Sequence, residues 1–219
     1  MTLVAMKRSR ILTALAMVAS WSCSALASPE SDFWAWFQRE EPKLFAWETD
    51  QERVFDSVGA AMHRVDPDLT FEFGPVEGGK REFVISAGGV QSAFPAVESL
   101  YRAAPSLPRW IWIKFRPRRS MSFDVSMQGK TVKPDDVRFT MVKDGDKVGI
   151  TLFFRDFSES ERMKFAQIGY LFLDQALGEY AVETQVGFIE FMGQESKHAA
   201  KASPLLDLPN RFDAYWQRK

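Results

Sequence analysis

Apolar residues recur along this chain with two different periods, which separate helices from strands. Apolar positions three or four residues apart predict helices at residues 33–47, 51–64, 95–104, 158–177 and within 205–216. Serine or aspartate side chains are expected to cap three of them: Ser31 or Asp32, then Asp50, then Ser158 or Ser160. Gly178 stands where a helix C-cap glycine belongs.

Strict alternation of apolar and polar residues predicts strands at residues 69–73, 82–87, 109–116, 121–128, 137–142, 147–155 and 180–188. The first two strands form a hairpin, and so do the two around Asp144-Gly145, because glycine accepts the positive φ of a tight turn. Gly187 is expected to be a bulge, since the apolar parity changes after it. The mixed order of elements predicts an α+β fold, a mostly antiparallel sheet with helices packed on one face.

Residues 1–27 have the three parts of a secretory signal peptide. Lys7, Arg8 and Arg10 precede an apolar stretch, and Ala25-Leu26-Ala27 supplies the small residues of a cleavage site. We therefore expect cleavage after Ala27 and a periplasmic or secreted protein. The apolar stretch is too short to cross a bilayer, so no stable membrane span is expected after cleavage.

The rest of the chain is expected to fold as a single domain. Residues 28–193 form the α+β domain, and residues 194–219 form a polar linker and a C-terminal docking helix. Cys23 is the only cysteine and lies in the leader, which excludes disulfides and cysteine ligands from the mature chain. Lipidation of Cys23 is the alternative, but the Leu usual three positions upstream is missing.

Charge and motif content narrow the possible partners. Removal of the leader leaves 25 basic residues (28 minus 3) against 29 acidic ones, a net charge of −4, which argues against nucleic acid as a partner. His63 and His198 have no companion at metal-ligand spacing. Gly88-Gly89 precedes a helix, as phosphate loops do, but the Walker lysine and the dinucleotide glycine spacing are absent. No cofactor and no metal are therefore expected.

The best candidate site is a strand that carries aromatic and basic residues at alternate positions. Side chains two apart on a strand share a face, so indoles and fixed positive charges would form a surface suited to sugars, planar groups or anions. Its members are Trp110, Trp112, Lys114 and Arg116, continued by Arg118 and Arg119. In the alternative interpretation both indoles pack under the aromatic helix at residues 33–37, and the basic residues pair with acidic neighbours.

Two acidic clusters offer other chemistry. Glu72 and Glu82 face each other across the first predicted hairpin and suit a hydrolase that uses two carboxylates in unequal environments. Asp174 and Glu179 lie at the end of the longest helix, where negative charge is unfavourable. They are expected to form a salt link, with Arg155 or Arg162 as partner, or else to bind a cation.

Four segments together resemble a family of uncharacterised bacterial proteins: Phe33-Trp34-x-Trp36-Phe37, Glu82-Phe83-x-Ile85-Ser86-Ala87-x-Gly89, Ala104-Pro105-x-Leu107-Pro108-x-Trp110 and Leu173-Asp174-x-x-Leu177-Gly178-Glu179. The resemblance implies a stand-alone α+β domain and no particular chemistry. The leading hypothesis is a non-enzymatic envelope protein that binds a ligand or partner protein through the Trp110 to Arg119 face. The rival is a hydrolase acting on an envelope glycan.

Overall fold

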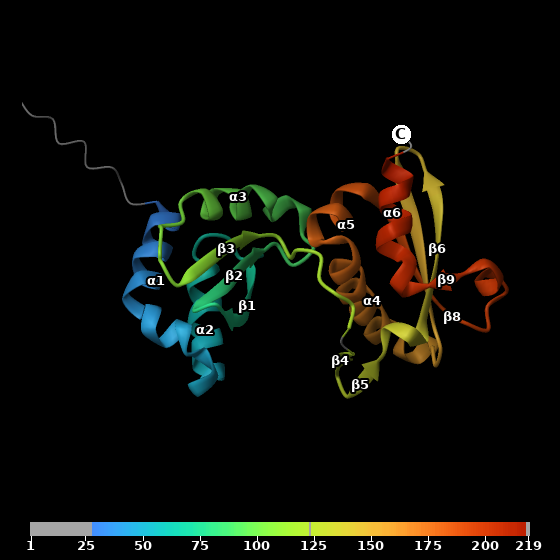
Figure 1. Cartoon of the computed structure of the whole chain (residues 1–219), viewed down its shortest axis with the longest axis horizontal. Coiled ribbons are helices and arrows are strands. Elements are labelled where there is room, and N and C mark those ends of the chain that lie inside the picture. The colour runs from blue at the N-terminus through green and yellow to red at the C-terminus, as the bar shows by residue number, and fades with distance from the viewer. Residues whose placement is uncertain (1–27, 123, 218–219) are drawn as a thin grey trace, which may run out of the picture.

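The strands are divided among three small sheets, and the helices pack around two of them (Figure 1). The computed structural model describes residues 28–122 and 124–217. The predicted leader, residues 1–27, lies outside the described residues, as does Phe123. The α+β class is confirmed. The described residues form two hydrophobic clusters, and we call the parts around them the N-terminal lobe (28–115) and the C-terminal lobe (121–217).

The N-terminal lobe is built on a three-stranded sheet of order β1-β2-β3. Strands β1 and β2 are the predicted hairpin, and β3 lies parallel to β2 after a helical crossover. The elements are α1 (Pro29–Phe45), α2 (Gln51–Met62), β1 (Thr70–Glu77), β2 (Lys80–Ser86), α3 (Phe94–Arg102) and β3 (Trp110–Lys114), with 3-10 turns at Trp47–Thr49 and Gln91–Ala93.

Helix α1 begins earlier than the sequence pattern predicts. The Ser28 side chain accepts a hydrogen bond from the Ser31 backbone N–H, and Pro29 occupies the first turn, where a missing N–H costs nothing. Ser31 and Asp32 are therefore inside the helix and do not cap it. The aromatic side chains of α1 pack on the sheet, with Phe37 and Phe83 ring centroids 5.1 Å apart.

The C-terminal lobe is built on a four-stranded sheet of order β8-β7-β6-β9, beside a two-stranded ribbon of β4 and β5. Helices α4, α5 and α6 cover one face of the larger sheet (Figure 1). The elements are β4 (Val125–Met127), β5 (Lys130–Val132), β6 (Val137–Asp144), β7 (Lys147–Phe154), α4 (Arg162–Leu177), α5 (Glu179–Gln185), β8 (Val186–Gly193), β9 (Ser203–Pro204) and α6 (Leu208–Trp216), with 3-10 turns at Pro134–Asp136, Glu159–Glu161, Lys197–Lys201 and Leu205–Asp207.

The hairpin of β6 and β7 agrees with the sequence pattern. Gly145 adopts φ 61° at its turn, and the strands pair from Val137↔Phe154 to Asp144↔Lys147. The inward positions of β7 are completely buried, as the alternation predicts: Val148, Ile150, Leu152 and Phe154.

Two boundaries in the C-terminal lobe correct the sequence prediction. Residues 180–185 are helical, and the last long strand begins only at Val186. The bulge predicted at Gly187 is confirmed, because Val148 pairs with Val186 and Ile150 with Ile189. Neither Ser158 nor Ser160 caps α4, which follows a 3-10 turn and has no side-chain cap.

The two lobes share one topology, although no sequence repeat is visible. In each, an antiparallel hairpin is followed by a helical crossover and by a strand parallel to the second hairpin strand: β1-β2-α3-β3, then β6-β7-α4-α5-β8. In the described ranges, no helix combines the length and the apolar character that a bilayer span requires.

Candidate functional site

The two tryptophans of β3 belong to the core of the N-terminal lobe. Trp110 is 5% exposed, and its ring stacks on Trp112 with centroids 5.7 Å apart. The edge of Phe37 lies against both indoles. Ile111, on the opposite face of β3, is 43% exposed, so the face that carries the two indoles is the inward one.

The basic residues of the predicted face each pair with an acidic side chain. The pairs are Lys114–Glu98, Arg116–Glu72, Arg116–Asp174, Arg118–Asp213 and Arg119–Glu82. Indoles packed against the aromatic helix and paired cations are the arrangement of the alternative interpretation, with Trp110 buried and Trp112 partly buried. The six predicted site residues therefore do not form one aromatic and basic surface.

Glu72 and Glu82 lie on one face of the first sheet and bind the segment that joins the lobes, residues 116–120, which we call the junction segment. Arg116 forms an ion pair with Glu72, and Arg119 forms one with Glu82. Each carboxylate is engaged by a guanidinium, whereas glycosidic cleavage needs a carboxyl group that is free to act on the substrate. The arrangement does not support the proposed hydrolase pair.

Glu179 joins the two lobes through a buried carboxylate. The side chain is completely buried, and its oxygens accept backbone N–H bonds from Ala87 at 2.9 Å, Gly89 at 3.3 Å and Arg116 at 2.9 Å. Its own backbone N–H donates to the Arg116 carbonyl at 2.9 Å. Because Gly178 takes φ 82° and ends α4, the chain turns here and directs Glu179 toward the N-terminal lobe.

Asp174 and Arg116 form a second polar link beside Glu179. Arg116 Nη1 lies 3.4 Å from Asp174 Oδ2, so neither Arg155 nor Arg162 is the partner that the sequence suggested. Burial raises the pKa of Asp174 to about 7, since the stabilising charge of Arg116 is offset by Glu179 and Glu183. For Arg116, burial opposes the charge, but Glu72, Asp174 and Glu179 outweigh it and raise the pKa.

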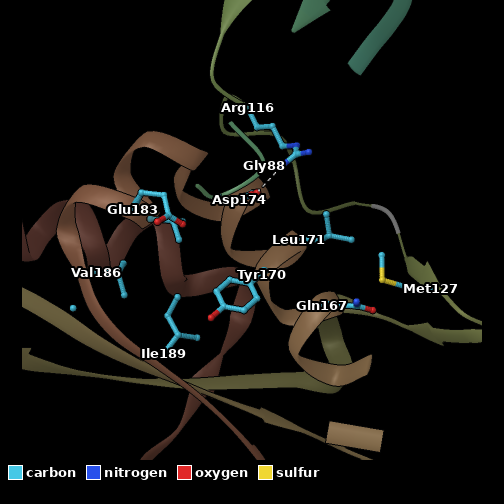
Figure 2. Close-up of a pocket in the computed structure, with 13 residues that line it drawn as sticks. Gly88, Arg116, Met127, Gln167, Tyr170, Leu171, Asp174, Glu183, Val186 and Ile189 are labelled. Carbon is cyan, nitrogen blue, oxygen red and sulfur yellow. Dashed lines mark hydrogen bonds and ion pairs between the residues drawn. The ribbon is translucent and has the colours of Figure 1, made fainter. Parts of the chain in front are cut away.

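Arg116 and Asp174 line a pocket of about 580 Å³ between the lobes, which we call the junction pocket (Figure 2). The N-terminal lobe contributes Gly88 and Gly89, and the junction segment contributes Arg116. The C-terminal lobe contributes polar side chains, Gln167, Tyr170, Asp174 and Glu183, and apolar walls that include Leu171, Val182 and Ile189.

Glu183 of α5 faces this pocket, and its carboxylate has no hydrogen bond or ion pair with another residue in the described part of the chain. Burial raises its pKa, and Glu179 adds to the effect, while Lys147 partly offsets it. A Cβ at Gly89 would lie 3.4 Å from Glu183 Oε1, and Gly89 has φ 82°. Glycine at this position therefore lets the loop after β2 approach the carboxylate.

Sequence reasoning singled out Gly88-Gly89, Arg116, Asp174 and Glu179, but as parts of separate features. The structure brings them to one place. Glu183 was missed, because the pattern assigned residues 180–188 to a strand and gave no reason to place that side chain beside Asp174. The one available signal was the spacing of four residues between Glu179 and Glu183, which places both side chains on the same side of a helix.

Comparisons with protein-family models, with curated proteins and with solved structures found no match. The resemblance to the uncharacterised bacterial family stays a prediction. Among residues 28–122 and 124–217, no group of three or more His, Cys, Asp or Glu side chains is arranged to hold a metal ion. Function is therefore inferred from the chemistry of the pocket itself.

Proposed function

We propose that this protein is a ligand-binding domain whose ligand, a small organic cation with an apolar body, occupies the junction pocket. Its ammonium group lies against Asp174 and Glu183, and its body lies against Leu171, Val182 and Ile189. The observation that carries the proposal is a carboxylate, Glu183, that faces the pocket with no described cation bonded to it.

The charge of the pocket supports a cation. Its lining holds two acidic side chains, Asp174 and Glu183, against one basic side chain, Arg116. The guanidinium of Arg116 is already bonded to Glu72 and Asp174. Burial disfavours the charged forms of Glu183 and Asp174, and a bound ammonium group would stabilise them.

The shape of the pocket supports a small molecule. A volume of about 580 Å³ falls within the range of small-molecule sites. Such sites typically combine apolar walls with a few convergent polar groups and lie between parts of the fold. The junction pocket has both properties, since Gly88 and Val182 come from different lobes.

We also propose that the protein works outside the cytoplasm, on the basis of the leader at residues 1–27. Ser28, the first residue after the expected cleavage, is the N-cap of α1, so the first described helix begins directly after the expected cleavage site. Intact-mass measurement of protein from the periplasm or medium should give a chain that begins at Ser28. A chain that retains Met1 in the cytosol would reject this location.

Calorimetric titration with cyclohexylmethylamine, compared with the neutral isostere cyclohexylmethanol, tests the proposed ligand class. We expect the amine to bind at least tenfold more tightly than the alcohol at pH 8, and its affinity to fall from pH 8 to pH 6 as Asp174 takes up a proton. Glu183→Gln should weaken amine binding at least tenfold.

Glu190→Gln is the matched control. Glu190 is an exposed carboxylate of β8 that lies outside the pocket lining, and its removal should leave the affinity unchanged. Equal binding of amine and alcohol would reject the cation. Absence of binding by either compound, or an equal loss in both variants, would reject the junction pocket as the binding site.

A further inference from the structure

A second pocket adjoins the junction segment and shares Arg116 with the junction pocket. Its volume is about 450 Å³. We call it the basic pocket, after three of the basic residues that the sequence singled out. The side chains used below are Lys114, Phe115, Arg118 and Tyr180, together with Glu98 at the rim.

The lining of the basic pocket has an excess of positive charge. It holds three basic side chains, Lys114, Arg116 and Arg118, against one acidic side chain, Glu98. Arg116 is already bonded to Glu72 and Asp174, so Lys114 and Arg118 are the cations that a ligand would meet. Lys114 and Glu98 form a pair in which both side chains are more than one third exposed. Exposed pairs of this kind contribute little to stability, so a ligand carboxylate can replace Glu98 as the partner of Lys114 at small cost.

Arg118 is held in place and still has donors to offer. Its Nε donates to the Leu177 carbonyl at 3.0 Å, and its two terminal nitrogens donate to the Asp213 carboxylate at 2.8 Å each. A guanidinium has five N–H groups, so two remain for another acceptor. These two lie on different nitrogens and point apart, so a ligand carboxylate would accept one charge-assisted hydrogen bond from Arg118 and a second from Lys114.

Aromatic rings form another wall of the pocket. Phe115 and Tyr180 have ring centroids 5.3 Å apart, and Phe94 lies behind both. Tyr180 is 51% exposed, so its ring is accessible. Phe115 has φ 60°, a left-handed conformation that is rare for a bulky residue and that tends to occur at functional sites.

We propose that the basic pocket is a second binding site, for a planar aromatic ring that carries a carboxylate. The carboxylate lies against Arg118 and Lys114, and the ring packs on Tyr180. This combination of planar and anionic recognition is the one expected of the Trp110 to Arg119 segment. Phe115 and Tyr180 take the place of the two buried indoles.

Calorimetric titration of the purified protein with naphthalene-2-carboxylate tests the site, with the neutral naphthalene-2-carboxamide as the matched ligand. We expect the acid to bind at least tenfold more tightly than the amide. Arg118→Met and Lys114→Met should each weaken acid binding at least fivefold, and Tyr180→Leu should weaken acid and amide alike. Lys43→Met, an exposed lysine of α1, should have no effect.

Thermal unfolding of each variant shows whether it is folded. If Arg118→Met does not fold, Lys114→Met is the variant that tests the site. Equal binding of acid and amide, no acid binding, or unchanged affinity in Lys114→Met would overturn the proposal. Glu183→Gln separates the two sites. Acid binding should survive this substitution, and its loss there would place the acid in the junction pocket and reject the basic pocket.

Discussion

The buried carboxylate of Glu179 accepts a hydrogen bond of 2.9 Å from the backbone N–H of Ala87, 92 residues earlier in the chain. The same carboxylate binds Gly89 and Arg116, so one side chain holds the loop after β2 and the junction segment against α5. These contacts set the walls of the junction pocket on both lobes.

Glu179→Ala is expected to lower the free energy of unfolding by about 3 kcal/mol or more, because buried N–H groups lose their acceptor and each such loss costs about 1–3 kcal/mol. Urea denaturation followed by circular dichroism measures the change. Glu159→Ala removes a carboxylate that is 71% exposed and should change stability by less than about 0.5 kcal/mol. Similar effects of the two substitutions would contradict the role of Glu179.

Asp174→Asn is expected to change the pH dependence of stability. The folded protein holds the Asp174 proton up to about pH 7, whereas the unfolded chain releases it near pH 3.8. Burial of Asp174 therefore makes wild-type stability fall as pH rises between these values, by up to about 1.4 kcal/mol per pH unit. Asp174→Asn should remove this slope, so the variant gains stability relative to wild type from pH 4 to pH 7.

Asp213→Asn should change the pH dependence of stability in the opposite direction, measured in the same experiment. A hydrogen bond from Arg118 lowers the pKa of Asp213, so this aspartate stabilises the fold above its unfolded pKa and loses that effect as pH falls. The variant should differ from wild type least at low pH. Parallel pH curves for wild type and Asp174→Asn would show that Asp174 titrates normally.

Trp110→Ala is expected to destabilise the protein by about 3–5 kcal/mol, as is usual when a buried aromatic ring is removed. Ile111→Ala, at the next position of β3, should cost about 1 kcal/mol because Ile111 is 43% exposed. Chemical denaturation of both variants measures the difference. A larger loss for Ile111→Ala would show that the Ile111 face of β3, and not the tryptophan face, packs in the core.

Two glycines in helices should respond to alanine in opposite ways. A Cβ at Gly169 would lie 2.3 Å from the buried Phe191 ring, so Gly169→Ala should cost about 1–3 kcal/mol despite the better helix propensity. A Cβ at Gly59 meets no atom within 4 Å, and Gly59→Ala should stabilise α2 by about 0.5–1 kcal/mol. Melting temperatures of the two variants that shift in the same direction would contradict this packing.

Local patterns in the sequence account for much of the fold. The β6–β7 hairpin follows from Asp144-Gly145 and from the alternation that places Val148, Ile150, Leu152 and Phe154 inside. In strand β3 the alternation does not show which face is buried, because Trp110 and Ile111 begin two apolar series on opposite faces. Alternation separates the series, but only the burial of Trp110 against Phe37 decides which one faces the core.

The site was less predictable because its contacts span the whole chain. Residues 180–185 alternate like a strand, yet they are helical, and the side chain of Glu179 just before them is bonded to backbone groups more than 60 residues away. No local pattern reports such a contact. The pairing of Arg116 with Asp174, 58 residues apart, is equally invisible in the sequence.

The walls of the junction pocket are drawn from positions between Gly88 and Ile189. The N-terminal lobe supplies only Gly88 and Gly89, and the other walls come from positions 116 to 189, so neither lobe forms the pocket without the other. The pocket itself exists only once strand β8 has been synthesised. A chain that ends before β8 therefore lacks part of the pocket wall, and we expect it not to bind the proposed ligand.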